Sequence, residues 1–274
     1  MTTPPAAALT WHHFPAGPNG FFRAPVLITG SMEAMLIDGS FTLSDGRAVA
    51  EAVRRTGKRL TTIYVSQSDP DYYFSLGPIK EAFPHARVIA ASETVAGIRA
   101  NVEKKLAIWG PQLKDNGPQT LADVVIPDPF DGKALTVDGE KVEIINADNL
   151  ANRRYLWVPK LRAVFGGVLV FSGTHVWTAD TPSRERAMWV SNLEKIVARN
   201  PAIVVPGHMV VGAAMDISGI EHTKAYLLAF EEELAKAKDS AELMAAMNNR
   251  FPALAMEVAL NIGAQVATGE MKWN

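Results

Sequence analysis

Two carboxylates lie two residues apart in the stretch Ser66-Gln67-Ser68-Asp69-Pro70-Asp71-Tyr72. The stretch follows an apolar run, residues 60–65, that predicts a buried strand, and it precedes a helical pattern. Polar loops at the carboxyl end of a strand often carry binding and catalytic residues in α/β proteins. Two carboxylates this close repel each other unless a cation, a proton or hydrogen-bond donors lie between them. Carboxylates that only cap the helix by accepting backbone N–H bonds are the structural alternative.

His208 ends a second predicted strand, residues 202–205, after Pro206-Gly207. Together with Asp69 and Asp71 it would form a ligand set of one imidazole and two carboxylates, which suits a divalent Zn, Mn or Fe ion. Without a metal, His208 beside Asp71 is a general base whose pKa the carboxylate would raise, and Tyr72 is a hydrogen-bond donor. We therefore predict Asp71, His208 and Tyr72 as catalytic residues. Asp69, Asp71 and His208 are the predicted ligands if one metal is bound.

Further polar and aromatic side chains fall in loops that follow predicted strands at the same edge of the sheet. A single loop after the strand predicted at 163–171 carries His175, Trp177 and Asp180, and another strand ends at Asp148. The structural alternatives are a surface loop and an ordinary Asp-Asn turn. We predict that substrate contacts come from six residues: Gln67, Tyr73, His175, Trp177, Asp180 and Asp148.

The elements that would position these residues alternate between strands and helices. Strands are expected at 22–29, 33–37 and 60–65, with helices beginning at Ser44, near Leu76 and at Ser92. A polar connector at 110–117 precedes strands at 135–137, 141–145, 155–158 and 163–171, and Asp138-Gly139 predicts a hairpin turn. A helix from Ser183 and helices after Ser218 complete the chain. This order predicts a layered α/β protein.

Composition limits the classes of partner. The chain has 274 residues, a formal net charge of −2 and no cysteine. The charge balance argues against nucleic acid as a partner, and the absence of cysteine excludes disulfides and thiolate metal sites. No apolar run approaches the roughly 20 residues of a membrane helix. We expect a protein without a membrane segment, cytoplasmic, or periplasmic if a signal peptide was removed, that acts on a small molecule, with a homodimer as one option.

Several of these residues together resemble the metallo-β-lactamase superfamily over residues 20–212. The resemblance rests on the hairpin ending Leu36-Ile37-Asp38-Gly39, on the x-Pro-Asp loop, on Gly166-Gly167-Val168 and on Val205-Pro206-Gly207-His208. The family signature His-x-His-x-Asp-His falls on residues 67–72. Its aspartate matches Asp71, and its three histidines fall on Gln67, Asp69 and Tyr72. The middle histidine would fall near Asp148 or Asn149, and the bridging aspartate falls on Val168.

The resemblance implies a four-layer αββα sandwich, two mixed β-sheets flanked by helices. We expect a single domain over 1–274, with a core at about 20–212 and a helical extension at 213–274. It implies a hydrolase of a small ester, lactone or amide with an altered, histidine-poor site. The family's dizinc site is not expected, because glutamine, tyrosine and valine are poor or impossible zinc ligands. The alternatives are a metal-free enzyme that uses His208, Asp71 and Tyr72, and a binding protein without catalysis.

Overall fold

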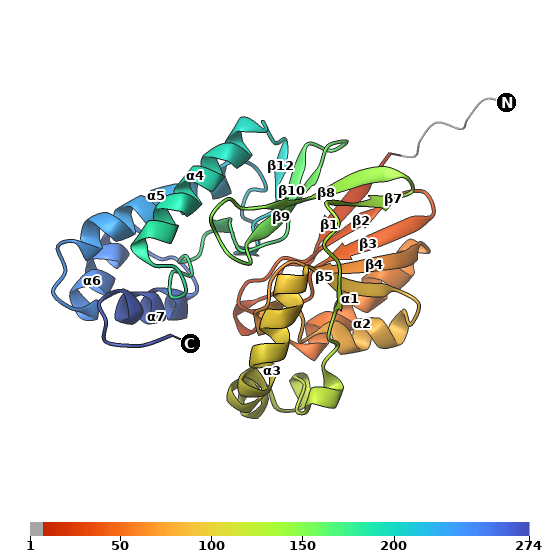
Figure 1. The fold of residues 1–274 in the computed structure, drawn as a ribbon, viewed down its shortest axis with the longest axis horizontal. Coiled ribbons are helices and arrows are strands. Elements are labelled where there is room, and N and C mark those ends of the chain that lie inside the picture. Colours follow the sequence, from red (N-terminus) through yellow and green to blue (C-terminus); the bar gives the residue numbers. More distant parts are fainter. Residues whose placement is uncertain (1–7, 274) are drawn as a thin grey trace.

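A computed structural model describes residues 8–273, and it contains two large β-sheets between helices (Figure 1). The first sheet has six strands in the order β1-β2-β3-β4-β5-β6, with bounds Thr10–His13, Val26–Thr29, Glu33–Ile37, Arg59–Val65, Arg87–Ala90 and Asp128–Pro129. The second has the order β12-β10-β9-β8-β7, with bounds Ile203–Val204, Ala163–Phe165, Arg154–Val158, Glu140–Asn146 and Ala134–Val137. Both sheets contain parallel and antiparallel pairs. The fold is therefore the predicted sandwich of mixed sheets.

The alternation of side chains in β3 explains why the sandwich has four layers. Met35 and Ile37 belong to the buried cluster that also contains Leu156 of the second sheet, whereas Ala34 and Leu36 belong to the cluster that contains the helices. Because successive side chains of a strand point to opposite faces, this strand is covered on both faces. A strand that is apolar at consecutive positions is the sequence pattern that such double burial requires.

Helices cover the outer faces of both sheets. On the side of the first sheet lie α1, α2 and α3 (Figure 1), with bounds Leu43–Thr56, Leu76–Ala82 and Ser92–Leu113. On the other side lie α4 to α7, with bounds Ser183–Ala198, Ser218–Leu234, Ser240–Arg250 and Glu257–Ala267. Among residues 8–273, no helix has both the length and the apolar composition needed to cross a membrane.

Two sequence expectations about elements were wrong. The strand predicted at 163–171 is broken into β10 and a short β11, Phe171–Ser172, because Gly166 and Gly167 adopt φ of +70° and +76°. The chain thereby turns so that β11 pairs in parallel with β13, His208–Met209. The connector predicted at 110–117 is helical to Leu113, so that Pro111 lies inside the last turn of α3 and the helix ends two residues after it.

Candidate functional site

The loop after β4 forms one turn of 3-10 helix, Pro70–Tyr72, at the edge of the first sheet. Asp69 occupies the position before this turn, but its side chain makes no capping hydrogen bond. Its carboxylate instead faces Lys105 of α3, with 3.7 Å between Oδ1 and Nζ. The capping alternative therefore does not describe Asp69, whose carboxylate is turned towards a cation.

His208 reaches the same loop from β13. Its Nδ1 lies 2.7 Å from the carbonyl oxygen of Phe21, and because a carbonyl only accepts, Nδ1 carries the proton. The other ring nitrogen, Nε2, lies 3.6 Å from Oδ2 of Asp71 and 3.4 Å from the hydroxyl of Tyr72. The imidazole ring also stacks on Phe171, with 5.0 Å between the ring centroids. The neutral ring thus presents a lone pair to the two residues that the sequence predicted beside it.

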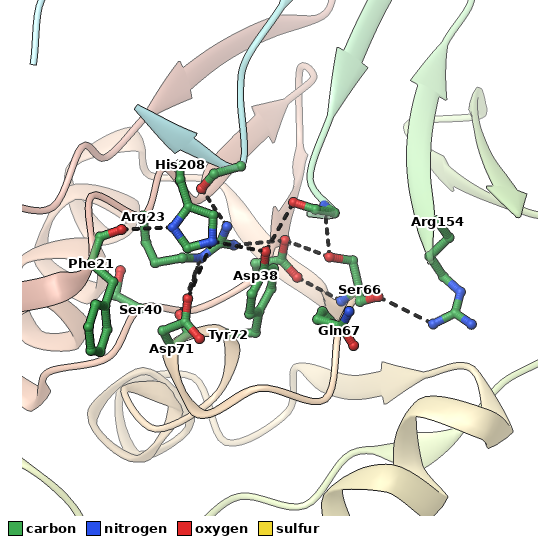
Figure 2. A network of polar contacts seen from close by, with 12 residues as sticks. Phe21, Arg23, Asp38, Ser40, Ser66, Gln67, Asp71, Tyr72, Arg154 and His208 are labelled. Carbon is green, nitrogen blue, oxygen red and sulfur yellow. Dashed lines mark hydrogen bonds and ion pairs between the residues drawn. The ribbon is translucent and has the colours of Figure 1, made fainter. Parts of the chain in front are cut away.

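Arg23 supplies the positive charge at the centre of this cluster (Figure 2). Its Nη2 donates to Oδ2 of Asp38 at 3.1 Å, and its Nε lies 3.7 Å from Oδ2 of Asp71. Its Cζ lies 3.5 Å from the ring centroid of Tyr72, a cation–π contact that is worth about 2 kcal/mol when desolvated. The side chains of Arg23 and Asp38 are both fully buried. Breaking such a buried pair costs about 3–5 kcal/mol, because one charge is left uncompensated.

Asp38 is held in place by the start of the same loop. Its carboxylate accepts hydrogen bonds from the backbone N–H of Ser66 at 2.6 Å and from the Ser66 hydroxyl at 2.8 Å. The Ser66 hydroxyl in turn accepts from the N–H of Gly167 at 2.9 Å. These bonds tie the ends of β3 and β4 to the glycine turn of the second half, so the site has a fixed frame.

Burial sets the proton affinities of the two central groups in opposite directions. Desolvation raises the pKa of Asp71 to about 7, even though the nearby Arg23 guanidinium works against the rise. Desolvation, helped by the charge of Arg23, lowers the pKa of His208 to about 3. The expectation that Asp71 would raise the pKa of His208 was therefore wrong, because burial and Arg23 dominate. Near neutral pH the imidazole is uncharged, and Asp71 is the group that exchanges a proton.

A pocket opens in front of this cluster and encloses about 550 Å³ of empty space, its open mouth included. Water-sized molecules can be centred in about 70 Å³ of it, and the remaining space includes open solvent. Asp69, Asp71, Tyr72 and His208 contribute to its walls, and Lys105 adds an ammonium group. The remaining lining is mostly aromatic and apolar: Phe21, Phe41, Pro70, Trp109, Val168, Trp177, Met256 and Trp273.

The sequence of residues 19–208 matches the family model described as the metallo-beta-lactamase superfamily. The chain belongs to this superfamily. No curated protein matches it. Among solved structures, a metallo-beta-lactamase family protein from Thermus thermophilus superposes with a TM-score of 0.65 at 20% identity, covering 95% of this chain and 91% of that one. A metallo-beta-lactamase from Pontibacter korlensis gives a TM-score of 0.55 at 17% identity, covering 75% and 87%. At these identities the likeness establishes the fold.

Superfamily membership implies divalent metal ions, but the side chains of this member do not fit them. Within residues 8–273, no group of three or more His, Cys, Asp or Glu side chains is placed to hold a metal ion. Asp69, predicted as a ligand, faces Lys105, and Asp71 and His208 share their surroundings with the guanidinium of Arg23. The predicted site of Asp69, Asp71 and His208 is therefore not formed as a metal centre, because cationic side chains lie against both carboxylates.

Of the residues predicted to contact substrate, Trp177 lines the pocket and five others do not. Gln67 accepts from Asn152 at 2.7 Å and from the N–H of Ser68 at 2.6 Å, so its amide oxygen organises the loop. Tyr73 is completely buried and packs in the hydrophobic core.

The other three predicted contacts are engaged elsewhere. Nδ1 of His175 is hydrogen-bonded to the hydroxyl of Tyr226, 3.1 Å away. Asp180 pairs with Arg153 at 2.9 Å, and Asp148 pairs with Lys195 on the surface. Proximity to the ends of strands was a poor guide here, because each of these side chains is paired with a residue that does not line the pocket.

Among the site residues that sequence reasoning missed are Arg23, Lys105, Trp109 and Trp273. A signal existed for Arg23, since a single arginine within the otherwise apolar run 22–29 requires a buried carboxylate partner. Lys105 and Trp109 lie four positions apart on α3 and therefore on one face of that helix. Trp273 comes from the segment after α7, and its ring lies 5.1 Å from that of Trp177. No local pattern connects these two tryptophans.

Proposed function

We propose that this protein hydrolyses a small ester or lactone with an apolar, ring-bearing body, and that Asp71 is the base that activates water. The observation that carries this proposal is the position of Asp71 on the wall of an aromatic pocket, with its Oδ2 3.6 Å from the unprotonated Nε2 of His208. A base works best when its pKa lies near the working pH, and the raised pKa of Asp71, about 7, meets that condition.

The chemistry assigns one role to each side chain. The Asp71 carboxylate removes a proton from water, while Nε2 of His208 accepts a hydrogen bond from the same molecule. The water oxygen then bonds to the carbonyl carbon, and the electron pair of the C=O bond moves to oxygen. Burial keeps the pKa of Tyr72 well above its ordinary range, so its hydroxyl stays protonated. The hydroxyl donates to the carbonyl oxygen of Gly167 at 3.2 Å and would turn from that acceptor to donate to the oxyanion. When the C–O bond to the leaving group breaks, Asp71 returns the proton to it.

The aromatic lining supports the choice of substrate body. Phe21, Phe41 and Trp109 contact one another, with 5.3 Å between the centroids of Phe41 and Trp109. The Trp177–Trp273 pair comes from the other half of the chain. Rings on such walls favour flat apolar groups, since aromatic pairs gain about 0.5–1.5 kcal/mol beyond burial alone.

The test is hydrolysis of a panel of chromogenic aryl esters and aromatic lactones, with a chelator present throughout. Asp71→Asn should lower kcat/KM at least about 100-fold, the usual effect of losing a general base. Asp148→Asn is the matched control, because this carboxylate lies at the surface beside Lys195 and should leave the rate unchanged. If the wild type hydrolyses none of the panel but binds the compounds, catalysis is excluded for them and a binding protein remains.

A further inference from the structure

We propose that the guanidinium of Arg23 is the resident cation of this site, in place of the divalent metal ion that membership of the superfamily implies. The inference concerns the charge at the centre of the site, so it does not depend on which substrate is hydrolysed. It starts from the acidic and imidazole groups that surround the guanidinium.

Three potential ligands converge on Arg23. Asp38 meets its Nη2 at 3.1 Å, and Oδ2 of Asp71 lies 3.7 Å from its Nε. The same Oδ2 lies 3.6 Å from Nε2 of His208. Two carboxylates and one imidazole with a free nitrogen are donors of the types that Mn²⁺, Fe²⁺ or Zn²⁺ takes, although among residues 8–273 no such group is placed to hold a metal ion. In this chain the centre of that set is filled by a side chain that carries its own charge (Figure 2).

The guanidinium is held too firmly to be displaced easily. Its Nε and Nη1 also donate to the backbone carbonyls of Asp71 and Gly207, and the ring of Tyr72 covers its face. The side chain of Arg23 is fully buried. If this buried cation left, two carboxylates would remain in a low-dielectric interior without their counter-charge. A divalent ion therefore cannot enter unless Arg23 is removed.

The position of Arg23 in the chain makes the arrangement possible. It lies just before β2 and forms a β-bridge with His208, so its backbone is fixed beside one of the three groups. Asp38 follows β3, the neighbour of β2, and Asp71 lies in the loop after β4. Neighbouring elements of the fold thus place Arg23 close to Asp38 and Asp71.

The experiment measures binding of Mn²⁺ and Zn²⁺ by calorimetry and by thermal shift, in the wild type and in Arg23→Met. The wild type should bind neither ion at this site. Arg23→Met should bind one ion per chain at least about tenfold more tightly than the wild type. At 100-fold excess of metal over Kd, its Tm should rise by about 5 °C. Adding His208→Ala to Arg23→Met should abolish this binding.

Arg154→Met is the matched control. Arg154 is another buried arginine with an acidic partner, Glu93, but it does not lie between two carboxylates and an imidazole, so its removal should create no metal site. If Arg23→Met unfolds but is refolded by Mn²⁺ or Zn²⁺, the proposal is supported. It is overturned if the wild type binds one ion that His208→Ala removes, or if a folded Arg23→Met binds none. If Arg23→Met stays unfolded even with metal, metal binding by the wild type is the deciding measurement. A loss of hydrolysis in any variant leaves these binding outcomes unchanged.

Discussion

Asp71 and His208 meet with 3.6 Å between Oδ2 and Nε2, although one comes from the first sheet and the other from the segment that closes the second half. The protonation state of each group differs from the one that the other group alone would favour. Burial raises the pKa of the carboxyl and lowers the pKa of the imidazole, so the proton at neutral pH belongs to Asp71 or to solvent. This division of the proton makes Asp71, rather than His208, the group whose ionisation should govern activity.

The rate of hydrolysis should rise with pH through about 7, because the base form of Asp71 must be ionised and burial raises its pKa to that value. The measurement is kcat/KM for the best aryl ester between pH 5 and pH 9. Asp71→Glu should retain a pH-dependent residual rate, whereas Asp71→Asn should give a low rate without the inflection. An inflection that persists in Asp71→Asn would assign the base to another group.

Element order and the central pair could be predicted from the sequence because they rest on local signals. Apolar runs, Asp138-Gly139 and Pro206-Gly207 mark strands and turns, and strand ends in an α/β sheet bring Asp71 and His208 together. The position of Arg23 at the centre of the site could not be predicted in the same way. The pairing of Arg23 with Asp38 depends on three-dimensional neighbours, and so does the approach of Trp273 to Trp177. The partners of His175 and Asp148 were likewise set by helices packed later in the chain.

Gly167→Ala should destabilise the protein by about 2–4 kcal/mol, measured by urea denaturation. Gly167 has φ of +76°, and an added Cβ would fall on the backbone carbonyl oxygen of Arg154. Gly57 is the control: its φ is +65°, but an added Cβ meets no atom within 4 Å. Gly57→Ala should therefore cost only the strain of the left-handed backbone, about 1–2 kcal/mol. Equal losses in the two variants would show that the close approach to Arg154 carries no extra cost.

Trp273→Ala should weaken binding of aryl substrates, with KM raised about tenfold and kcat nearly unchanged. The ring lines the pocket beside Trp177 and lies 5.3 Å from the ammonium of Lys105, so its loss removes a piece of the wall rather than a reacting group. Leu228→Ala, at an exposed position of α5, is the control and should leave KM unchanged. Small aliphatic esters should be affected less than aryl esters, and an equal effect on both would argue against an aromatic wall.

Lys105→Met should lower kcat/KM by about tenfold or more if the ammonium helps to stabilise the oxyanion. The side chain lines the pocket, and its nearest acidic partner is Asp69 at 3.7 Å. Lys105→Arg should restore part of the rate, because the charge is kept while its position changes. Asp69→Asn removes the partner and should leave a positive charge in place, so it should reduce the rate less than Lys105→Met. The kinetic comparison of these three variants separates charge from packing.

The pH dependence of stability should show two opposing contributions from the central pair. Asp71 binds its proton more tightly when folded, so its contribution is fully present below pH 3.8 and is lost as pH rises through about 7. His208 resists protonation when folded, so its contribution is present above pH 6.5 and is lost as pH falls towards about 3. Urea denaturation from pH 4 to pH 8 measures both. Asp71→Asn should gain stability relative to the wild type as pH rises, by at most about 1.4 kcal/mol per pH unit. His208→Asn should gain relative to the wild type as pH falls below 6.5. Parallel curves for the wild type and both variants would contradict the assigned protonation states.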